Sequence, residues 1–171
     1  MQIEDWERQL DLIGEPLPAV ELGLRWLRAN LPPAAELALV HGDFRLGNFI
    51  VSERGLEAVI DWELAHLGDP AEDIGWLSVR SWRFGNDQLP VAGLGGLEDF
   101  LAAYEAAGGR APEPERLRFW EAFGNLKWAV ICARQAYDHR SGERRSHELA
   151  SLGRRICEPE WDLLELIVAT A

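Results

Sequence analysis

One short stretch of the sequence groups residue types that could do chemistry. It reads LVHGDFRLGN over residues 39–48, with a carboxylate at Asp43 and a carboxamide at Asn48. An apolar strand is expected just before it, so Asp43 is predicted at a strand end, where a ligand can reach it. A second carboxylate, Asp61, stands in AVIDWE over residues 58–63. The segment between Asn48 and Asp61 is predicted to be a β-hairpin, which brings its two ends together.

Two carboxylates and an amide oxygen that converge form a set of hard oxygen ligands with a base beside them. Mg²⁺ takes few protein ligands and completes its octahedron with water and phosphate oxygens, so Asn48 and Asp61 suffice for it at a nucleotide site. In such a site Asp43 accepts the proton of the attacking hydroxyl. Arg45, two residues further on, is placed to neutralise charge on the transferred phosphoryl group.

The elements that position these residues are predicted to be mainly helical. Apolar residues at helical spacing predict helices over residues 3–12, 19–31, 70–82, 97–107, 114–139 and 143–168. Short apolar runs predict strands over residues 37–40, 48–51 and 56–60, with a turn at 52–55. Pro159 is expected to kink or reset the last helix. The predicted fold class is mainly α with a small β-hairpin (α+β), in a single domain over residues 1–171.

Composition excludes several classes of protein. The chain has 17 Lys and Arg against 29 Asp and Glu, a net charge of −12 that repels a phosphate backbone, so no nucleic-acid partner is expected. No run approaches the roughly 20 apolar residues of a membrane span, and the acidic, polar start is unlike a signal peptide. The cysteines, Cys132 and Cys157, form no CxxC pair, which indicates a reducing, cytoplasmic compartment.

Three further polar residues are expected to support the site. His41 is predicted to bond a neighbouring backbone group and so hold the loop. Asp69, just before Pro70, is placed to cap the helix that begins there, and Asp73 lies in its first turn, where the helix dipole favours a carboxylate. Trp76 falls on the apolar face of the same helix and is expected in the core.

The motifs HGDFRLGN and DWELAHLGDPAEDIGWL resemble those of the aminoglycoside phosphotransferase family, kinase-like enzymes that phosphorylate small-molecule hydroxyls. The Asp43–Asn48 spacing is similar to the catalytic loop of protein kinases, where four residues separate Asp and Asn. The phrases LRWLRANLPP and LGRRICEPEWDLLELI resemble the branch found beside, or fused to, acyl-CoA dehydrogenases. The resemblance covers nearly the whole chain.

This resemblance implies the C-terminal, mostly helical lobe of a protein-kinase-like fold, with ATP as co-substrate and Mg²⁺ as cofactor. It implies Asp43 as the catalytic base, with Asn48 and Asp61 as the Mg²⁺ ligands. In this scheme Asp69 and Asp73 brace the loops of the site.

The family's N-terminal lobe of β-strands, with its phosphate-covering loop and lysine, has no counterpart in the sequence. The residues before the HGD motif are predicted to be helical and contain no lysine, and the sole lysine of the chain is Lys127. The GLGG string at residues 93–96 lacks the preceding strand and following lysine of a phosphate-binding loop. We therefore expect half of a kinase, which self-associates or binds a partner chain that supplies the N-terminal lobe. The contact is expected around Phe49, Ile50 and Ile60, which the missing lobe leaves uncovered.

Three functions remain open at this point. The first is a phosphotransferase that moves the γ-phosphoryl of ATP to a hydroxyl of a small molecule. The second is a binding or regulatory half-kinase that kept the site but does not turn over. The third is a metal-dependent hydrolase, for which two metal ligands and one base are few.

The acceptor is also open. An acidic cleft would suit an aminoglycoside, whereas a cluster of arginines near the C-terminus would suit a hydroxyacyl-CoA thioester. This cluster consists of Arg140, Arg144, Arg145, Arg154 and Arg155.

Overall fold

The computed structural model describes residues 2–168, which group into two compact units. The first unit comprises the described residues up to Leu31 and those from Ala122 onward, and the second runs from Pro32 to Glu121. Helix α5 (Pro114–Ser141) contributes its first turns to the second unit and the rest to the first.

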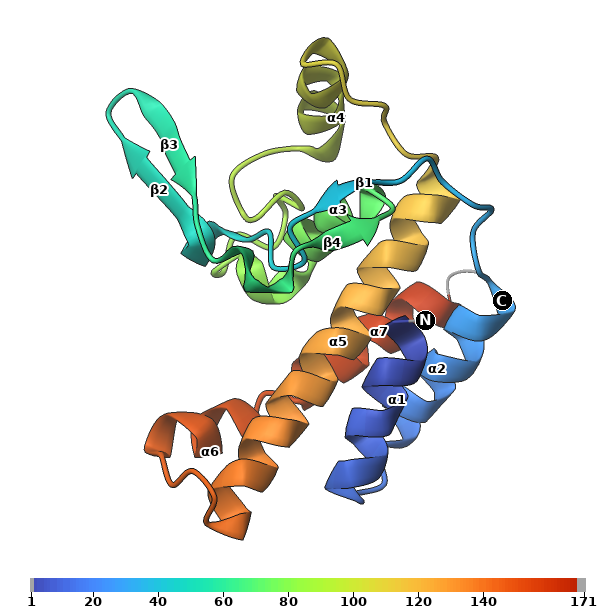
Figure 1. Cartoon of the computed structure of the whole chain (residues 1–171), viewed down its shortest axis with the longest axis vertical. Coiled ribbons are helices and arrows are strands. Elements are labelled where there is room, and N and C mark those ends of the chain that lie inside the picture. Colours follow the sequence, from blue (N-terminus) through green and yellow to red (C-terminus); the bar gives the residue numbers. More distant parts are fainter. Residues whose placement is uncertain (1, 169–171) are drawn as a thin grey trace. The chain divides into compact units, whose positions relative to one another are not determined.

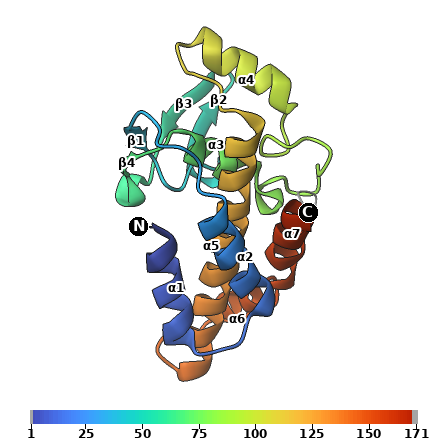
Figure 2. The same ribbon diagram turned by 90° about the vertical axis from the view of Figure 1, so that its right-hand side faces the viewer.

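The first unit is built from packed helices (Figures 1 and 2). Helices α1 (Gln2–Ile13) and α2 (Pro18–Ala29) run antiparallel, and Gly14, with φ of 68°, turns the chain after α1. Pro18 begins α2, where the missing backbone N–H leaves no intrahelical bond unmade. The two helices bury one apolar face each, formed by Ile3, Leu10, Ile13, Val20, Leu24 and Leu27.

The chain after α5 forms two helices, α6 (His147–Gly153) and α7 (Cys157–Val168). The prediction of one continuous helix over residues 143–168 was wrong. The Ser146 side chain caps the start of α6, and the chain leaves α-helical geometry between α6 and α7. Pro159 lies buried in the first turn of α7, so this proline helps to begin a new helix and does not kink a longer one.

Two antiparallel strand pairs belong to the second unit. Strand β2 (Phe49–Ser52) pairs with β3 (Gly55–Val59) in the predicted hairpin, which is confirmed. Strand β1 (Ala38–Val40), also predicted, pairs with β4 (His66–Gly68). The sequence did not predict β4, because its residues His-Leu-Gly form neither an apolar run like that of β1 nor a stretch long enough to alternate.

Helices α3 (Ala71–Ser78) and α4 (Leu97–Ala106) complete the second unit. The helix predicted over residues 70–82 ends earlier, at Ser78, and a 3₁₀ turn over Arg80–Trp82 follows it. A small core forms around Leu77, Val91 and Ala92. The side chains packed against this core are Phe44, Leu46, Phe49, Leu97 and Phe100.

Gly75 lets α3 lie directly against the backbone of α5. A Cβ atom at this position would stand 2.5 Å from the carbonyl carbon of Trp120 and 2.8 Å from the nitrogen of Glu121. Only glycine therefore fits this helix contact.

The predicted fold class is confirmed, since the chain is mainly helical with one small hairpin and a second short strand pair. No helix within residues 2–168 combines the length and the apolar character needed to cross a bilayer.

Candidate active site

The backbone of the loop after β1 is held by Asp73. The Asp73 carboxylate accepts the N–H of His41 at 2.7 Å and the N–H of Gly42 at 2.9 Å. Gly42 has φ of 82°, and a Cβ there would lie 2.6 Å from the carbonyl oxygen of Leu64, so the turn requires glycine. Asp73 thereby joins the first turn of α3 to the loop that carries Asp43.

His41 ties the same loop to the segment before Asp61. Its ring is buried, with 2% exposure. Nδ1 accepts the backbone N–H of Asp43 at 3.1 Å, and Nε2 donates to the carbonyl oxygen of Ile60 at 2.9 Å. One accepting and one donating nitrogen describe a neutral imidazole that serves as a crosslink.

The Asp43 carboxylate is surrounded by three side-chain donors. Trp76 Nε1 donates to Oδ1 at 2.8 Å, and Asn48 Nδ2 donates to Oδ2 at 2.7 Å. Arg45 Nε lies 3.1 Å from both oxygens. The carboxylate is nevertheless 17% exposed, which leaves it a face toward a substrate.

Arg45 is fixed on its other side by an aromatic ring. Its guanidinium carbon stands 5.1 Å from the centre of the Trp82 ring, a cation–π contact. Gly47 leaves the space that the guanidinium occupies, because a Cβ at Gly47 would collide with Arg45 Nη1.

The backbone of Asn48 is hydrogen-bonded to the residue that precedes Asp61. Asn48 is buried, and its Nδ2 donates to both the carboxylate and the carbonyl oxygen of Asp43, which turns the amide oxygen away from Asp43. The Asn48 carbonyl accepts the N–H of Ile60 at 2.9 Å, and Asp61 follows directly. Asp61 is exposed and left-handed, with φ of 68°, a conformation that few non-glycine residues adopt outside functional sites and turns.

These oxygen donors fit Mg²⁺. Among residues 2–168, no three His, Cys, Asp or Glu side chains gather into a metal-binding group. Asn48 and Asp61 instead offer a neutral amide oxygen and an exposed carboxylate, a sparse pair of hard ligands that suits a cation held largely by water and phosphate.

Asp69 joins the start of α3 to α5. Its Oδ1 accepts the N–H of Ala71 at 3.0 Å, which caps the helix. Its Oδ2 accepts Trp120 Nε1 at 2.9 Å and pairs with Arg116. The sequence suggested the cap but missed these two partners, which stand 47 and 51 positions away.

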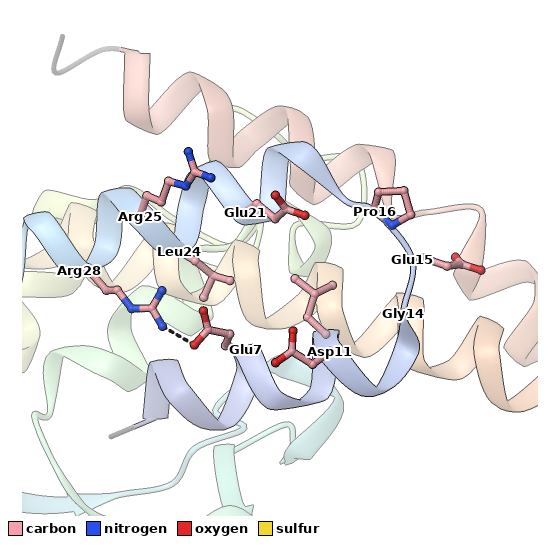
Figure 3. A pocket seen from close by; sticks show the side chains of 10 residues that line it. Glu7, Asp11, Gly14, Glu15, Pro16, Glu21, Leu24, Arg25 and Arg28 are labelled. Atoms are coloured by element: carbon pink, nitrogen blue, oxygen red, sulfur yellow. Dashed lines mark hydrogen bonds and ion pairs between the residues drawn. The ribbon is translucent and has the colours of Figure 1, made fainter.

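A pocket of about 470 Å³ lies between α1 and α2 of the first unit and contains none of the predicted site residues (Figure 3). Its wall is strongly charged, and two of its acidic residues form ion pairs. Arg28 donates to Glu7, and this hydrogen bond lowers the pKa of the Glu7 carboxyl. Glu15 pairs with Arg140, a member of the arginine cluster. These two ion pairs join α1 to α2, and the loop between them to α5.

The comparisons with known proteins decide the family. The chain matches the sequence profile of the phosphotransferase enzyme family, abbreviated APH, over residues 2–120. The chain belongs to this family. The resemblance predicted from the motifs is thereby confirmed.

Solved structures of phosphotransferases share the fold. A Ralstonia eutropha protein assigned as an aminoglycoside phosphotransferase superposes with a TM-score of 0.77 at 28% identity, covering 96% of this chain and 54% of that one. A choline/ethanolamine kinase family protein from Mesorhizobium loti superposes with a TM-score of 0.63 at 22% identity, covering 98% and 56%. The second likeness concerns the fold alone.

Among curated proteins, the chain is similar to two acyl-CoA dehydrogenase family members. Member 11 of Gallus gallus is 31% identical over 182 residues, which are 95% of this chain and 23% of that protein. Member 10 of Mus musculus is 27% identical over 176 residues, which are 94% and 16%. The chain therefore spans about half of the solved relatives and less than a quarter of these curated ones.

Proposed function

We propose that this chain carries the catalytic loop of an ATP- and Mg²⁺-dependent phosphotransferase that acts on a hydroxyl group of a small molecule. One observation carries the proposal. The Asn48 side chain donates to the Asp43 carboxylate at 2.7 Å, while its backbone carbonyl accepts the N–H of the residue before Asp61. A base and two metal ligands are thus connected through one buried residue.

Each residue has a distinct task in this proposal. Asp43 accepts the proton of the acceptor hydroxyl as that oxygen attacks the γ-phosphorus. Asn48 and Asp61 hold Mg²⁺, which when bound neutralises charge on the nucleotide phosphates. Arg45 is bonded to Asp43 and adds positive charge beside the place where the phosphoryl group is transferred.

For the acceptor we propose a hydroxyl on an acyl thioester in preference to an aminoglycoside. The support is the similarity over most of this chain to proteins named as acyl-CoA dehydrogenase family members. The arginine cluster gives weaker support, because Arg140 pairs with Glu15 and Arg155 pairs with Glu158.

A module that binds nucleotide without turnover is the second candidate. It is favoured by the position of the sole lysine of the sequence, Lys127. This residue is 5% exposed, and its Nζ stands 5.9 Å from the centre of the Trp6 ring in the first unit. Lys127 is therefore engaged within a helical core, where a phosphate has no access to it.

We further propose that another protein chain covers the hairpin and that the protein is cytoplasmic. Ile50 is 48% exposed and Ile60 is 44% exposed, and such apolar surface favours self-association or a partner chain. Phe49, which was expected in the same patch, instead packs against the small core around Leu77. Both cysteines are free thiols, which suits a reducing compartment. Light scattering on the purified chain tests the association, and a monodisperse monomer would contradict it.

Calorimetry and an ADP-release assay separate the candidates when they are run on the chain in a complex that includes the N-terminal lobe. Asp61→Ala is expected to abolish Mg²⁺-dependent ATP binding, since Asn48 alone supplies only a neutral oxygen. Asp43→Asn is expected to preserve binding and to lower kcat by about 10²- to 10⁴-fold, the usual contribution of a general base. Glu53→Gln in the hairpin turn removes the same charge away from these ligands and serves as the control.

The three possible results lead to different conclusions. Turnover that depends on Asp43 supports the phosphotransferase. Binding that depends on Asp61 without turnover supports the binding module. Equal ATP affinities in wild type and Asp61→Ala would remove Asp61 from the metal site and overturn the proposal.

A further inference from the structure

The indole of Trp76 is buried in the core, as the sequence predicted, and is also a direct partner of the Asp43 carboxylate. We propose that Trp76 is a positioning residue whose N–H fixes the orientation of that carboxylate. The inference rests on the proposed function, because it concerns the group assigned as the catalytic base.

The contact is short and well shielded. Trp76 is 3% exposed, and its Nε1 stands 2.8 Å from Asp43 Oδ1. An indole N–H that is buried needs an acceptor, and here the acceptor is the carboxylate itself. The orientation of Trp76 and that of Asp43 therefore depend on each other.

A closed ring of contacts surrounds this hydrogen bond. The Trp76 ring lies 5.1 Å from the Trp82 ring. The Arg45 guanidinium lies over Trp82 at 5.1 Å, and Arg45 Nε returns to the Asp43 carboxylate at 3.1 Å. Each of the four side chains thus touches two others, so none can change rotamer alone.

Helix α3 contacts both the backbone of the loop after β1 and the Asp43 side chain on that loop. Asp73 and Trp76 are three positions apart and therefore share one face of the helix. Asp73 accepts the backbone N–H groups of His41 and Gly42. Trp76 holds the carboxylate that follows them, so one helix face sets both the loop backbone and its reactive side chain.

For catalysis, these contacts fix the orientation of the Asp43 carboxylate. Rotating the Asp43 carboxylate would break its bonds from Trp76 on Oδ1 and from Asn48 on Oδ2 together. A base that stays in place meets the acceptor hydroxyl in the same geometry in every cycle. Misplacement by about 1 Å is enough to cost roughly 100-fold in rate.

Trp76→Phe tests the role, because phenylalanine keeps an aromatic ring in the core and lacks the N–H. Trp120→Phe is the matched control: it removes an indole N–H that donates to another carboxylate of the same unit, Asp69, at 2.9 Å. In ¹⁵N spectra of the full chain, we expect Trp76→Phe to shift the Asn48 side-chain amide signals and to speed their hydrogen exchange by about tenfold. Trp120→Phe is expected to leave them in place.

A second variant keeps the proposal testable if Trp76→Phe fails to fold. Asp43→Ala is expected to shift the Trp76 indole N–H signal and to leave the Trp120 signal unchanged. Asn48 amide signals that do not move in folded Trp76→Phe, or a Trp76 signal indifferent to Asp43→Ala, would overturn the inference.

Kinetics distinguish this inference from the proposed function. In an assay with turnover, Trp76→Phe is expected to lower kcat by about tenfold with KM values unchanged, because the hydrogen bond orients the base and does not bind substrate. Unchanged kcat in Trp76→Phe, with activity lost in Asp43→Asn, would refute the positioning role alone. Activity retained in Asp43→Asn would instead refute the role of Asp43 as base.

Discussion

Gly75→Ala is expected to destabilise the chain by disturbing the contact between α3 and α5. The added Cβ would stand 2.5 Å from the Trp120 carbonyl carbon, 2.6 Å from Trp120 Cβ and 2.8 Å from the Glu121 nitrogen. All three atoms belong to the backbone of α5 or are attached directly to it, so none can rotate away. The two helices must separate to admit the methyl group.

Two effects of opposite sign determine how far Gly75→Ala changes the free energy of unfolding. Alanine is more favourable than glycine inside a helix by about 1 kcal/mol. Overpacking a tight contact costs about 1–3 kcal/mol, and a contact closer than 3 Å to backbone belongs at the upper end. We expect a net loss of about 1–2 kcal/mol in the free energy of unfolding, measured by urea denaturation.

Gly95→Ala is the control for this measurement. Nothing lies within 4 Å of a Cβ at Gly95, so its replacement adds a methyl group without a clash. It is expected to change stability by less than about 0.5 kcal/mol. A Gly75→Ala protein as stable as wild type would show that helix propensity outweighs the contact, which would refute the reasoning.

Three smaller predictions concern local chemistry. Gly47→Ala is expected to displace the Arg45 guanidinium, which occupies the space beside Gly47, and this is seen as a shifted Arg45 Nε–H signal in ¹⁵N spectra; an unmoved signal would contradict it. Burial raises the pKa of the Cys132 thiol to about 12, so a thiol reagent at pH 8 should label the exposed Cys157 and reach Cys132 only after unfolding. Burial also raises the pKa of Glu160. Ionisation of this carboxyl therefore lowers the stability of the folded state as the pH rises above about 4. Glu160→Gln should therefore be more stable than wild type at pH 7 and similar to it at pH 3, in urea titrations.

The sequence was informative where the determinants are local. The hairpin follows from two apolar runs around a short turn, and the Asp43–Asn48 spacing lies within one loop. The partners of these residues come from far along the chain. Trp76 reaches Asp43 across 33 positions, and Trp120 reaches Asp69 across 51. Helical periodicity assigns Trp76 to a buried face but does not say which acceptor its N–H group meets.

The central claim is that Asn48 and Asp61 hold a divalent cation and nucleotide phosphates beside Asp43. Mn²⁺ replaces Mg²⁺ at oxygen sites and broadens nearby NMR signals, so a titration of the full chain with Mn²⁺ and ATP tests it directly. We expect selective broadening of the Asn48 side-chain amide and the Asp61 backbone amide, retained in Asp43→Asn and lost in Asp61→Ala. Broadening that spares both residues, or that persists in Asp61→Ala, would contradict the assignment.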